Sequence, residues 1–361
     1  MYKCEIITDS LSPTGDRLTT YKVTYPRIIH AEMLRHRMLS RNVASSRAIP
    51  FKKMVKDVEK NPFVPIAFQK PHKGMQGNEY WTDNDIVTVD EGDEYEVDTK
   101  IYSATEHFIT EWLEAKDLAV SQAYELNRLG VTKQLCNRLL EPFVWTTELI
   151  SGTEWDNFFE LRCPLYFGKY KSWKDACVVN GSLDFEAPLL ERLNSNASQA
   201  EIHIQRIAEM MWDAYNESTP KQLEAGEWHI PYGDKINLDS KGTVHPSDEL
   251  YGTTLRMWYA ASGIELPELK IATARCARLS YETLGDEPKI DYEADIKLHD
   301  RLLAQNHMSP FEHCAVAMTN KEYYYYRKGM VLSSDNDTYS NNTLGWCNNF
   351  KGFIQYRHLI N

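Results

Sequence analysis

The chain has 361 residues, of which 42% are hydrophobic and 25% are charged, a composition typical of a globular protein with one large domain or two modest ones. Its formal net charge of −12 argues against a surface that coats nucleic acid, so we expect any phosphate ligand to be bound by a local cluster of cations. This favours a nucleotide over a nucleic-acid polymer.

The N-terminus lacks the apolar stretch of a signal peptide, and no apolar run approaches the roughly 20 residues that span a bilayer. The seven cysteines are scattered and include no Cys-x-x-Cys pair, so we expect free thiols and no metal site. These features predict a soluble protein of a reducing cytoplasm, without a membrane partner.

The first predicted elements are a β-hairpin and an amphipathic helix. Residues 4–8 and 18–25 are rich in side chains that favour strands, and Pro13 and Gly15 between them supply a turn. Apolar residues then recur at near-helical spacing over residues 26–38, which predicts a helix.

Arg35 and Arg37 would lie about 200° apart around this helix, so we expect them to reach two different anions, or one anion and one carboxylate. Residues 40–47 are short and rich in hydrogen-bond donors, as in a loop that surrounds phosphate oxygens. The alternative is a solvated helix end with cations near its C-terminus. Composition alone favours neither interpretation.

The rest of the chain is predicted to be mainly helical. Residues 49–96 are rich in Pro, Gly and charge, which predicts a loop with short elements, interpreted as a flap. A long helix with mostly buried aromatics is predicted over 101–129, ending at Gly130, and a short one over 131–142 is stopped by Pro142. Two more helices follow capping boxes, one at 153–156 and one at Ser198 and Glu201. Three further helices are predicted over 250–261, 271–280 and 296–303. Residues 163–196 are interpreted as a surface insertion, residues 217–248 as a loop and residues 314–318 as a strand.

Arg138 and Arg162 each lie on a largely apolar predicted helix. A buried guanidinium group needs an anionic partner, which would be either a bound ligand or a carboxylate such as Glu148 or Glu160. The sequence leaves both alternatives open.

Three blocks of the sequence resemble segments of flavin-dependent thymidylate synthases. The first is Arg-His-Arg at residues 35–37, followed after seven residues by Ser45, and it includes Ser40, Asn42 and Arg47. The second covers residues 138–142, 157–162 and 198–202, and the third covers residues 277–280 together with His-Met-Ser-Pro-Phe-Glu-His at residues 307–313.

The resemblance implies an α+β fold with a helical core packed beside a mainly antiparallel sheet. We expect a single domain over residues 1–361 with insertions near residues 51–96, 163–196 and 217–248. In the family the third block precedes the first, whereas here it follows it. The order is therefore permuted, or a strand-helix unit is partly duplicated at residues 349–358.

The family converts dUMP to dTMP with methylenetetrahydrofolate as carbon donor, reduced FAD as hydride donor and NADPH as reductant, and the resemblance implies the same reaction here. A redox cofactor is needed because no protein side chain donates hydride. No cysteine lies beside an activating cluster that would make it a nucleophile. The resemblance also implies a homo-oligomer, expected to be a tetramer, in a bacterium or a virus-infected bacterial cell.

Positions that match the family's motifs carry its functional roles. Nucleotide binding is implied for Arg35, Ser45, Arg47, Arg138 and Arg162, and catalytic roles for Ser45, Arg138 and His307. Cofactor binding is implied for His36, Arg37, Asn42, Asn157, Ser280, His307, Ser309 and Glu312, with His307 where folate stacks. Arg47 and Arg138 are therefore expected to converge on one nucleotide, and no metal is implied.

Four positions depart from the family's pattern. Val43 stands in place of a glutamate, Ser46 in place of a glycine and Glu32 in place of a glutamine, and the arginine expected near Thr153 is missing. Because the first and third of these changes remove one carboxylate and add another, a different pyrimidine nucleotide or a hydroxymethylation is the alternative reaction. A non-catalytic nucleotide-binding or assembly protein on the same scaffold is the alternative from another functional class.

Overall fold

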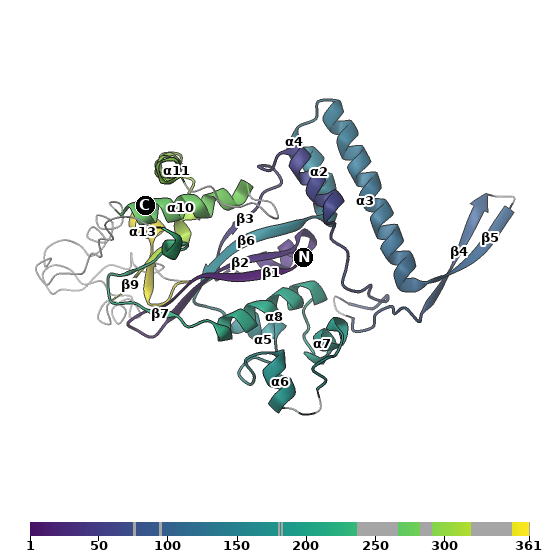
Figure 1. The fold of residues 1–361 in the computed structure, drawn as a ribbon, viewed down its shortest axis with the longest axis horizontal. Helices are drawn as coiled ribbons and strands as arrows, with labels where there is room; N and C mark the ends of the chain where they lie inside the picture. Colours follow the sequence, from purple (N-terminus) through teal and green to yellow (C-terminus); the bar gives the residue numbers. More distant parts are fainter. Residues whose placement is uncertain are drawn as a thin grey trace, which may run out of the picture.

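A five-stranded sheet lies at the centre of the computed structural model, with its strands in the order β3-β6-β2-β1-β7 (Figure 1). The structure describes residues 1–74, 77–93, 96–179, 181, 183–236, 266–281, 291–318 and 349–360. The strands of the central sheet are β1 (Lys3–Leu11), β2 (Arg17–Pro26), β3 (Ser40–Val43), β6 (Trp145–Gly152) and β7 (Lys221–Gln222). Neighbouring strands run antiparallel except β7, which is parallel to β1.

Two smaller sheets and many helices complete the fold, which confirms that it is α+β. The smaller sheets are β10 (Phe353–Gln355), β9 (Ala315–Ala317) and β8 (Trp228–His229), and the hairpin of β4 (Ile86–Asp93) and β5 (Glu96–Ser103). The α-helices are α1 (His30–Leu34), α2 (Phe51–Lys60), α3 (Ala104–Arg128), α4 (Lys133–Cys136), α5 (Asp156–Arg162), α6 (Trp173–Val179), α7 (Leu189–Ser195), α8 (Ile202–Glu217), α10 (Pro267–Arg278), α11 (Tyr292–Ala304) and α13 (Tyr356–Ile360). The 3-10 helices are η1 (Arg27–Ile29), η2 (Asn137–Phe143), η3 (Gly233–Lys235), η5 (Leu279–Tyr281) and η6 (Ser309–Glu312).

The two faces of the central sheet are covered by different layers, as Figure 1 shows. Successive side chains of a strand point to opposite faces. Tyr21 and Ile150 therefore belong to the hydrophobic core that includes residues of α5 and α8, whereas Leu149 packs with residues of α10 and η5 on the other face. The sheet thus separates two layers, and β6 contributes side chains to both.

Several predicted elements are confirmed. The hairpin of β1 and β2 turns at Gly15, whose φ of 85° is in the left-handed region that favours glycine. The long helix α3 ends just before Gly130, and the predicted helices over residues 271–280 and 296–303 are α10 and α11. The strand predicted over residues 314–318 is β9. The helix predicted over residues 250–261 lies outside the described residues.

The helix predicted over residues 26–38 is wrong in extent. Only η1 and α1 are helical, and the chain then turns to deliver β3 against β6, with Ser40 opposite Ser151. Pairing with the central sheet outweighs the helical periodicity. The loop predicted over residues 40–47 is accordingly a strand in its first half, and the angle expected between Arg35 and Arg37 on a helix does not apply.

The predictions around α2 and α3 also need correction. Helix α2 lies in a segment predicted to be a loop, although buried Phe51, Met54 and Val58 have helical spacing. The aromatics of α3 were expected in the core, but Ala104, Val120 and Ala123 are its buried residues. Only one side of α3 packs on the body, and from its first turn the β4–β5 hairpin projects outward (Figure 1).

Two capping boxes and one insertion differ from expectation. The backbone at the start of α8 donates to the Glu201 carboxylate instead of Ser198, and no side chain caps α5 at Trp155. The 3-10 helix η2 continues through Pro142 to Phe143. Residues 163–196 are not confined to the surface, because Tyr166, Trp173 and Leu193 are buried, the first two of them in the core beneath the sheet; that they are an insertion stays a prediction.

Further findings concern cysteines and membranes. The described cysteines are free thiols, namely Cys4, Cys136, Cys163, Cys177, Cys276 and Cys314. Within the described ranges, no helix combines the length and the apolar character needed to cross a bilayer.

Glu209 in α8 should make stability depend on pH. Its side chain is buried, Oε1 accepts hydrogen bonds from Asn196 and Gln205, and Oε2 has no partner. Burial raises the pKa of Glu209 from 4.5 to about 7. Because the folded pKa is the higher one, the folded state disfavours the carboxylate, and stability falls as the pH rises from 4.5 to 7.

We therefore expect Glu209→Gln to raise the free energy of unfolding at pH 8 by up to roughly 3 kcal/mol, and to change it little at pH 4. Glutamine keeps the acceptor at Oε1 and carries no charge. Urea denaturation at both pH values measures the effect, with the exposed Glu160→Gln as control. A loss of stability at pH 8 would show that Glu209 is stabilising as a carboxylate.

Candidate functional site

Asn42 in β3 joins three segments that are far apart in the sequence. Its Nδ2 donates to the Cys276 carbonyl at the end of α10 at 2.7 Å, and its Oδ1 accepts from Ser309 Oγ of η6 at 3.1 Å. Three residues later, the Ser45 amide donates to the Ser280 carbonyl at 3.1 Å. The structure therefore brings the first and third sequence blocks together, as expected.

The contacts of Asn42 indicate a structural role for its side chain. The side chain is buried, and both its donor and its acceptor are occupied by protein groups. Asn42 therefore acts first as a structural clamp between β3, α10 and η6. Its predicted contact with a cofactor stays a prediction.

Arg41, the residue before Asn42, joins β3 to the opposite face of the sheet. Its Nη2 donates to the His36 carbonyl at 3.0 Å, and its Nη1 lies 3.4 Å from Glu148 Oε1. Glu148 is fully buried, and its Oε2 accepts from Tyr25 Oη at 2.5 Å. Burial raises the pKa of Glu148, while Arg41 opposes that shift.

The carboxylate of Glu148 is therefore the partner of Arg41. The sequence left open a pairing of Glu148 with Arg138 or Arg162, and the carboxylate pairs with neither. No local sequence pattern indicates the pairing of Arg41 with Glu148, because it follows from the register of β3 against β6.

Arg162 in α5 is a buried cation without a carboxylate partner in the described part of the chain. It is 8% exposed, its Nη1 donates to the Phe158 carbonyl at 3.3 Å, and its Nε is buried without a hydrogen-bond partner. The guanidinium carbon lies 4.4 Å from the centre of the Phe158 ring. Burial lowers the pKa of Arg162 to about 10. The exposed Glu160 forms no ion pair with it among the described residues.

His36 packs on the same phenylalanine. Its ring meets Phe158 edge to face, with the ring centres 5.4 Å apart. Burial, and next the charge of Arg162, lower the pKa of His36. His36 and Arg162 therefore belong to one layer beneath the sheet, whereas Ser280 and Ser309 belong to the layer above it. The two layers approach each other at β3. Arg41 contacts His36 of the lower layer, and the next residue, Asn42, contacts Ser309 of the upper layer.

Four predicted cations lie on the surface near these segments. Arg35, Arg37 and Arg47 are exposed and flank β3, and Arg138 is exposed on η2. None of the four forms an ion pair within the described residues. The Asn137 side chain donates to the carbonyls of Ser46 and Ile49, which places η2 beside the segment that carries Arg47.

The environment of Arg47 and Arg138 differs from expectation. Arg138 was expected on a largely apolar helix, where a lone guanidinium would be costly, yet it is exposed, and Arg47 is exposed as well. The guanidinium groups of Arg47 and Arg138 are therefore solvated and need no anionic partner for the stability of the fold.

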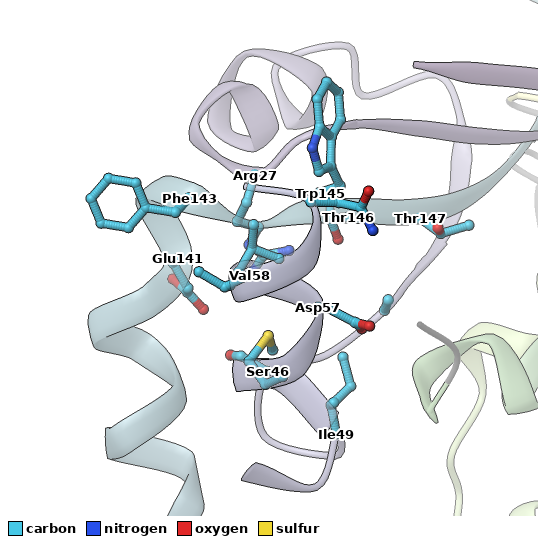
Figure 2. A pocket seen from close by; sticks show the side chains of 14 residues that line it. Arg27, Ser46, Ile49, Asp57, Val58, Glu141, Phe143, Trp145, Thr146 and Thr147 are labelled. Atoms are coloured by element: carbon cyan, nitrogen blue, oxygen red, sulfur yellow. The ribbon is translucent and has the colours of Figure 1, made fainter. Parts of the chain in front are cut away.

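A small cavity of about 30 Å³ lies behind the segment that carries Ser45 and Arg47. Figure 2 shows its lining, which comes from α2, β6 and residues 44–49. Arg27 also lines it, and its Nη1 is buried without a hydrogen-bond partner. The sequence did not single out Arg27, which lies outside the three blocks.

The remaining predicted residues divide by exposure. Asn157, His307 and Ser309 are exposed, and Ser280, Ser45 and Glu312 are half-buried. The Glu312 carboxylate is paired with Arg357 of α13. The structure joins Ser280, Ser309 and Glu312 to the β3 region through α10, η6 and α13, and it places Asn157 on α5 in the other layer.

Comparisons with known proteins give a weak likeness. No protein-family model matches the chain, and no curated protein matches it. Among solved structures, it is similar to a UMP/dUMP methylase, PolB from Streptomyces cacaoi bound with 5-Br dUMP, at 14% identity and a TM-score of 0.35, over 60% of this chain and 90% of that chain. The same enzyme bound with 5-Br UMP gives 14% identity and a TM-score of 0.32, over 60% of this chain and 88% of that chain. At these values the likeness carries no argument about activity.

Proposed function

We propose that the chain is a flavin-dependent methyltransferase that converts dUMP to dTMP, with methylenetetrahydrofolate as carbon donor and NADPH as reductant. The observation that carries the proposal is the junction at Asn42. Its contact with Ser309 links blocks 267 residues apart, and both blocks resemble the same enzyme family. The fold therefore brings these two blocks together at β3, as the resemblance implies.

The cations around β3 support an anionic ligand. Arg162 and Arg27 each have a buried guanidinium N–H without a partner, and the nearby exposed arginines form no ion pair among the described residues. Charge-assisted hydrogen bonds to phosphate are among the strongest that a protein makes. We therefore assign phosphate binding to Arg47, Arg138 and Arg162.

FAD would supply the hydride that completes the methyl group, and we assign its binding to residues other than Arg47, Arg138 and Arg162. His36 and Arg37 would hold FAD in the lower layer, and Ser280 and Ser309 in the upper layer. Asn42 would orient Ser309, and the Ser45 amide would hold the backbone of Ser280. Glu312 would act through its pairing with Arg357, which fixes η6 against α13.

Loading with FAD separates an enzyme from a binding protein. We expect purified protein to be yellow, or to become yellow with added FAD and keep the colour through gel filtration. A protein that stays colourless at saturating FAD would support the non-catalytic nucleotide-binding alternative. Light scattering on the same sample tests the proposed homotetramer, which a species of only 41.9 kDa would contradict.

A further inference from the structure

A row of buried polar side chains crosses the central sheet within its hydrophobic surroundings. The row, here called the polar row, consists of Ser10, His229, Thr20, Ser151 and His313. Each of the five is at most 2% exposed. A buried polar group is costly unless it is hydrogen-bonded, so an uninterrupted row of this length needs a physical reason.

The hydrogen bonds of the polar row are short and continuous. Ser10 Oγ lies 2.8 Å from His229 Nδ1, and His229 Nε2 lies 2.8 Å from Thr20 Oγ1. Thr20 Oγ1 lies 2.6 Å from Ser151 Oγ, which lies 2.8 Å from His313 Nδ1. The register of the sheet makes this possible, because Thr20 and Ser151 are directly opposite each other in β2 and β6.

The two ends of the polar row differ. Ser10 lines an open pocket of about 390 Å³, together with Asp9 and Trp228. His313 directly follows η6, the element that carries Ser309, and its buried Nε2 has no hydrogen-bond partner among the described residues. The row therefore runs from a pocket that is open to solvent to an unsatisfied ring nitrogen beside the candidate site.

We propose that the polar row is a proton relay that connects the candidate site to solvent. Every member is a hydroxyl or an imidazole, which can donate and accept at once. Burial lowers the pKa of His229 and His313 to about 3, so both rings are neutral and each carries a single N–H. Protons can then pass by reversal of the row's hydrogen bonds, without a buried imidazolium.

The step balances in protons and charge. His313 Nε2 accepts a proton, and the proton on its Nδ1 passes to Ser151. The Ser151 proton passes to Thr20, whose proton passes to His229 Nε2, and the proton on His229 Nδ1 passes to Ser10. Ser10 releases its own proton to water in the pocket. One proton enters, one leaves, and only N–H and O–H bonds change.

The proton that we assign to this relay is the one lost from C5 of the pyrimidine ring, an assignment that rests on the proposed function. Methylation at C5 replaces that hydrogen, so a proton must leave the site in each turnover. His313 is the inner end of the relay and receives the proton from the candidate site.

The tautomers of the two histidines test the relay without any activity. A conducting row requires the same tautomer in both rings, with the N–H on Nδ1 of both or on Nε2 of both. We expect ¹⁵N-detected spectra of the imidazole rings in the whole protein to show matching tautomers. With opposite tautomers, both rings would donate toward the Thr20–Ser151 hydroxyl pair or both would accept from it, and either arrangement would interrupt the row and overturn the relay.

A matched pair of variants tests the function of the row. Thr20→Val breaks it, whereas Thr24→Val removes a buried hydroxyl pair with Thr147 on the same two strands and leaves the row intact. We expect Thr20→Val to slow proton release from C5 by on the order of 100-fold, and Thr20→Ser to restore it. Thr24→Val should stay near the wild-type rate.

Equal rates for Thr20→Val and wild type, with comparable melting temperatures, would overturn the relay. If the wild-type protein releases no C5 proton at all, the proposed function fails, and the tautomer measurement alone decides whether the row is a relay.

Discussion

Arg47→Ala and Arg138→Ala should each weaken binding of deoxyuridylate by about 10- to 150-fold, because a charge-assisted hydrogen bond to phosphate contributes roughly 1.5–3 kcal/mol. Both side chains are exposed and form no ion pair within the described residues. Their replacement should therefore leave the melting temperature of the free protein and FAD loading nearly unchanged. Titration calorimetry with deoxyuridylate measures the affinity.

Arg128→Ala is the control for this pair. Arg128 is an exposed arginine at the end of α3, paired with Glu125. An exposed ion pair contributes little to stability, so this variant should behave like wild type in both measurements. Unchanged affinity in both Arg47→Ala and Arg138→Ala would remove them from the nucleotide site.

Arg162→Met should affect stability and binding in opposite directions. Arg162 is buried without a carboxylate partner among the described residues, and burial lowers its pKa to about 10. Replacing a buried charge with an apolar side chain of similar length should raise the free energy of unfolding by on the order of 1–3 kcal/mol. Loss of its phosphate contact should lower nucleotide affinity by about tenfold or more.

Thermal melts with and without deoxyuridylate measure both effects on one sample. The free variant should melt above the wild type, and the increase in melting temperature on adding nucleotide should be smaller than in the wild type. Arg41→Met is the contrasting variant, since it leaves Glu148 buried and unpaired and should lower stability by about 3–5 kcal/mol. A free Arg162→Met protein that is less stable than wild type would show that Arg162 is a structural residue.

Local sequence patterns predicted the elements that are set by short-range chemistry. The hairpin of β1 and β2, helix α3 and its end at Gly130 follow from strand composition, periodicity and a glycine with positive φ. Helix α2 could also have been predicted, because Phe51, Met54, Val55 and Val58 have helical spacing. The surrounding prolines and glycines hid that pattern.

Other features depend on partners that are distant in the sequence. The pairing of β3 with β6 replaces the end of the predicted helix, and no local pattern within residues 26–47 indicates it. For the same reason the salt bridge of Arg41 with Glu148 could not be predicted, since it arises only when the two strands are in register. That the segments carrying Asn42 and Ser309 lie close together was expected from the resemblance alone, and the hydrogen bond between the two side chains was not predicted.

Tritium release from C5-labelled deoxyuridylate tests the central claim most directly. The assay uses the whole protein with FAD, NADPH and methylenetetrahydrofolate, and labelled deoxycytidylate in a parallel reaction. We predict release of tritium to water from deoxyuridylate that requires both FAD and methylenetetrahydrofolate, together with formation of dTMP. Release from deoxycytidylate alone would assign another pyrimidine nucleotide as substrate, and no release from either, in protein that binds FAD, would contradict the proposed reaction.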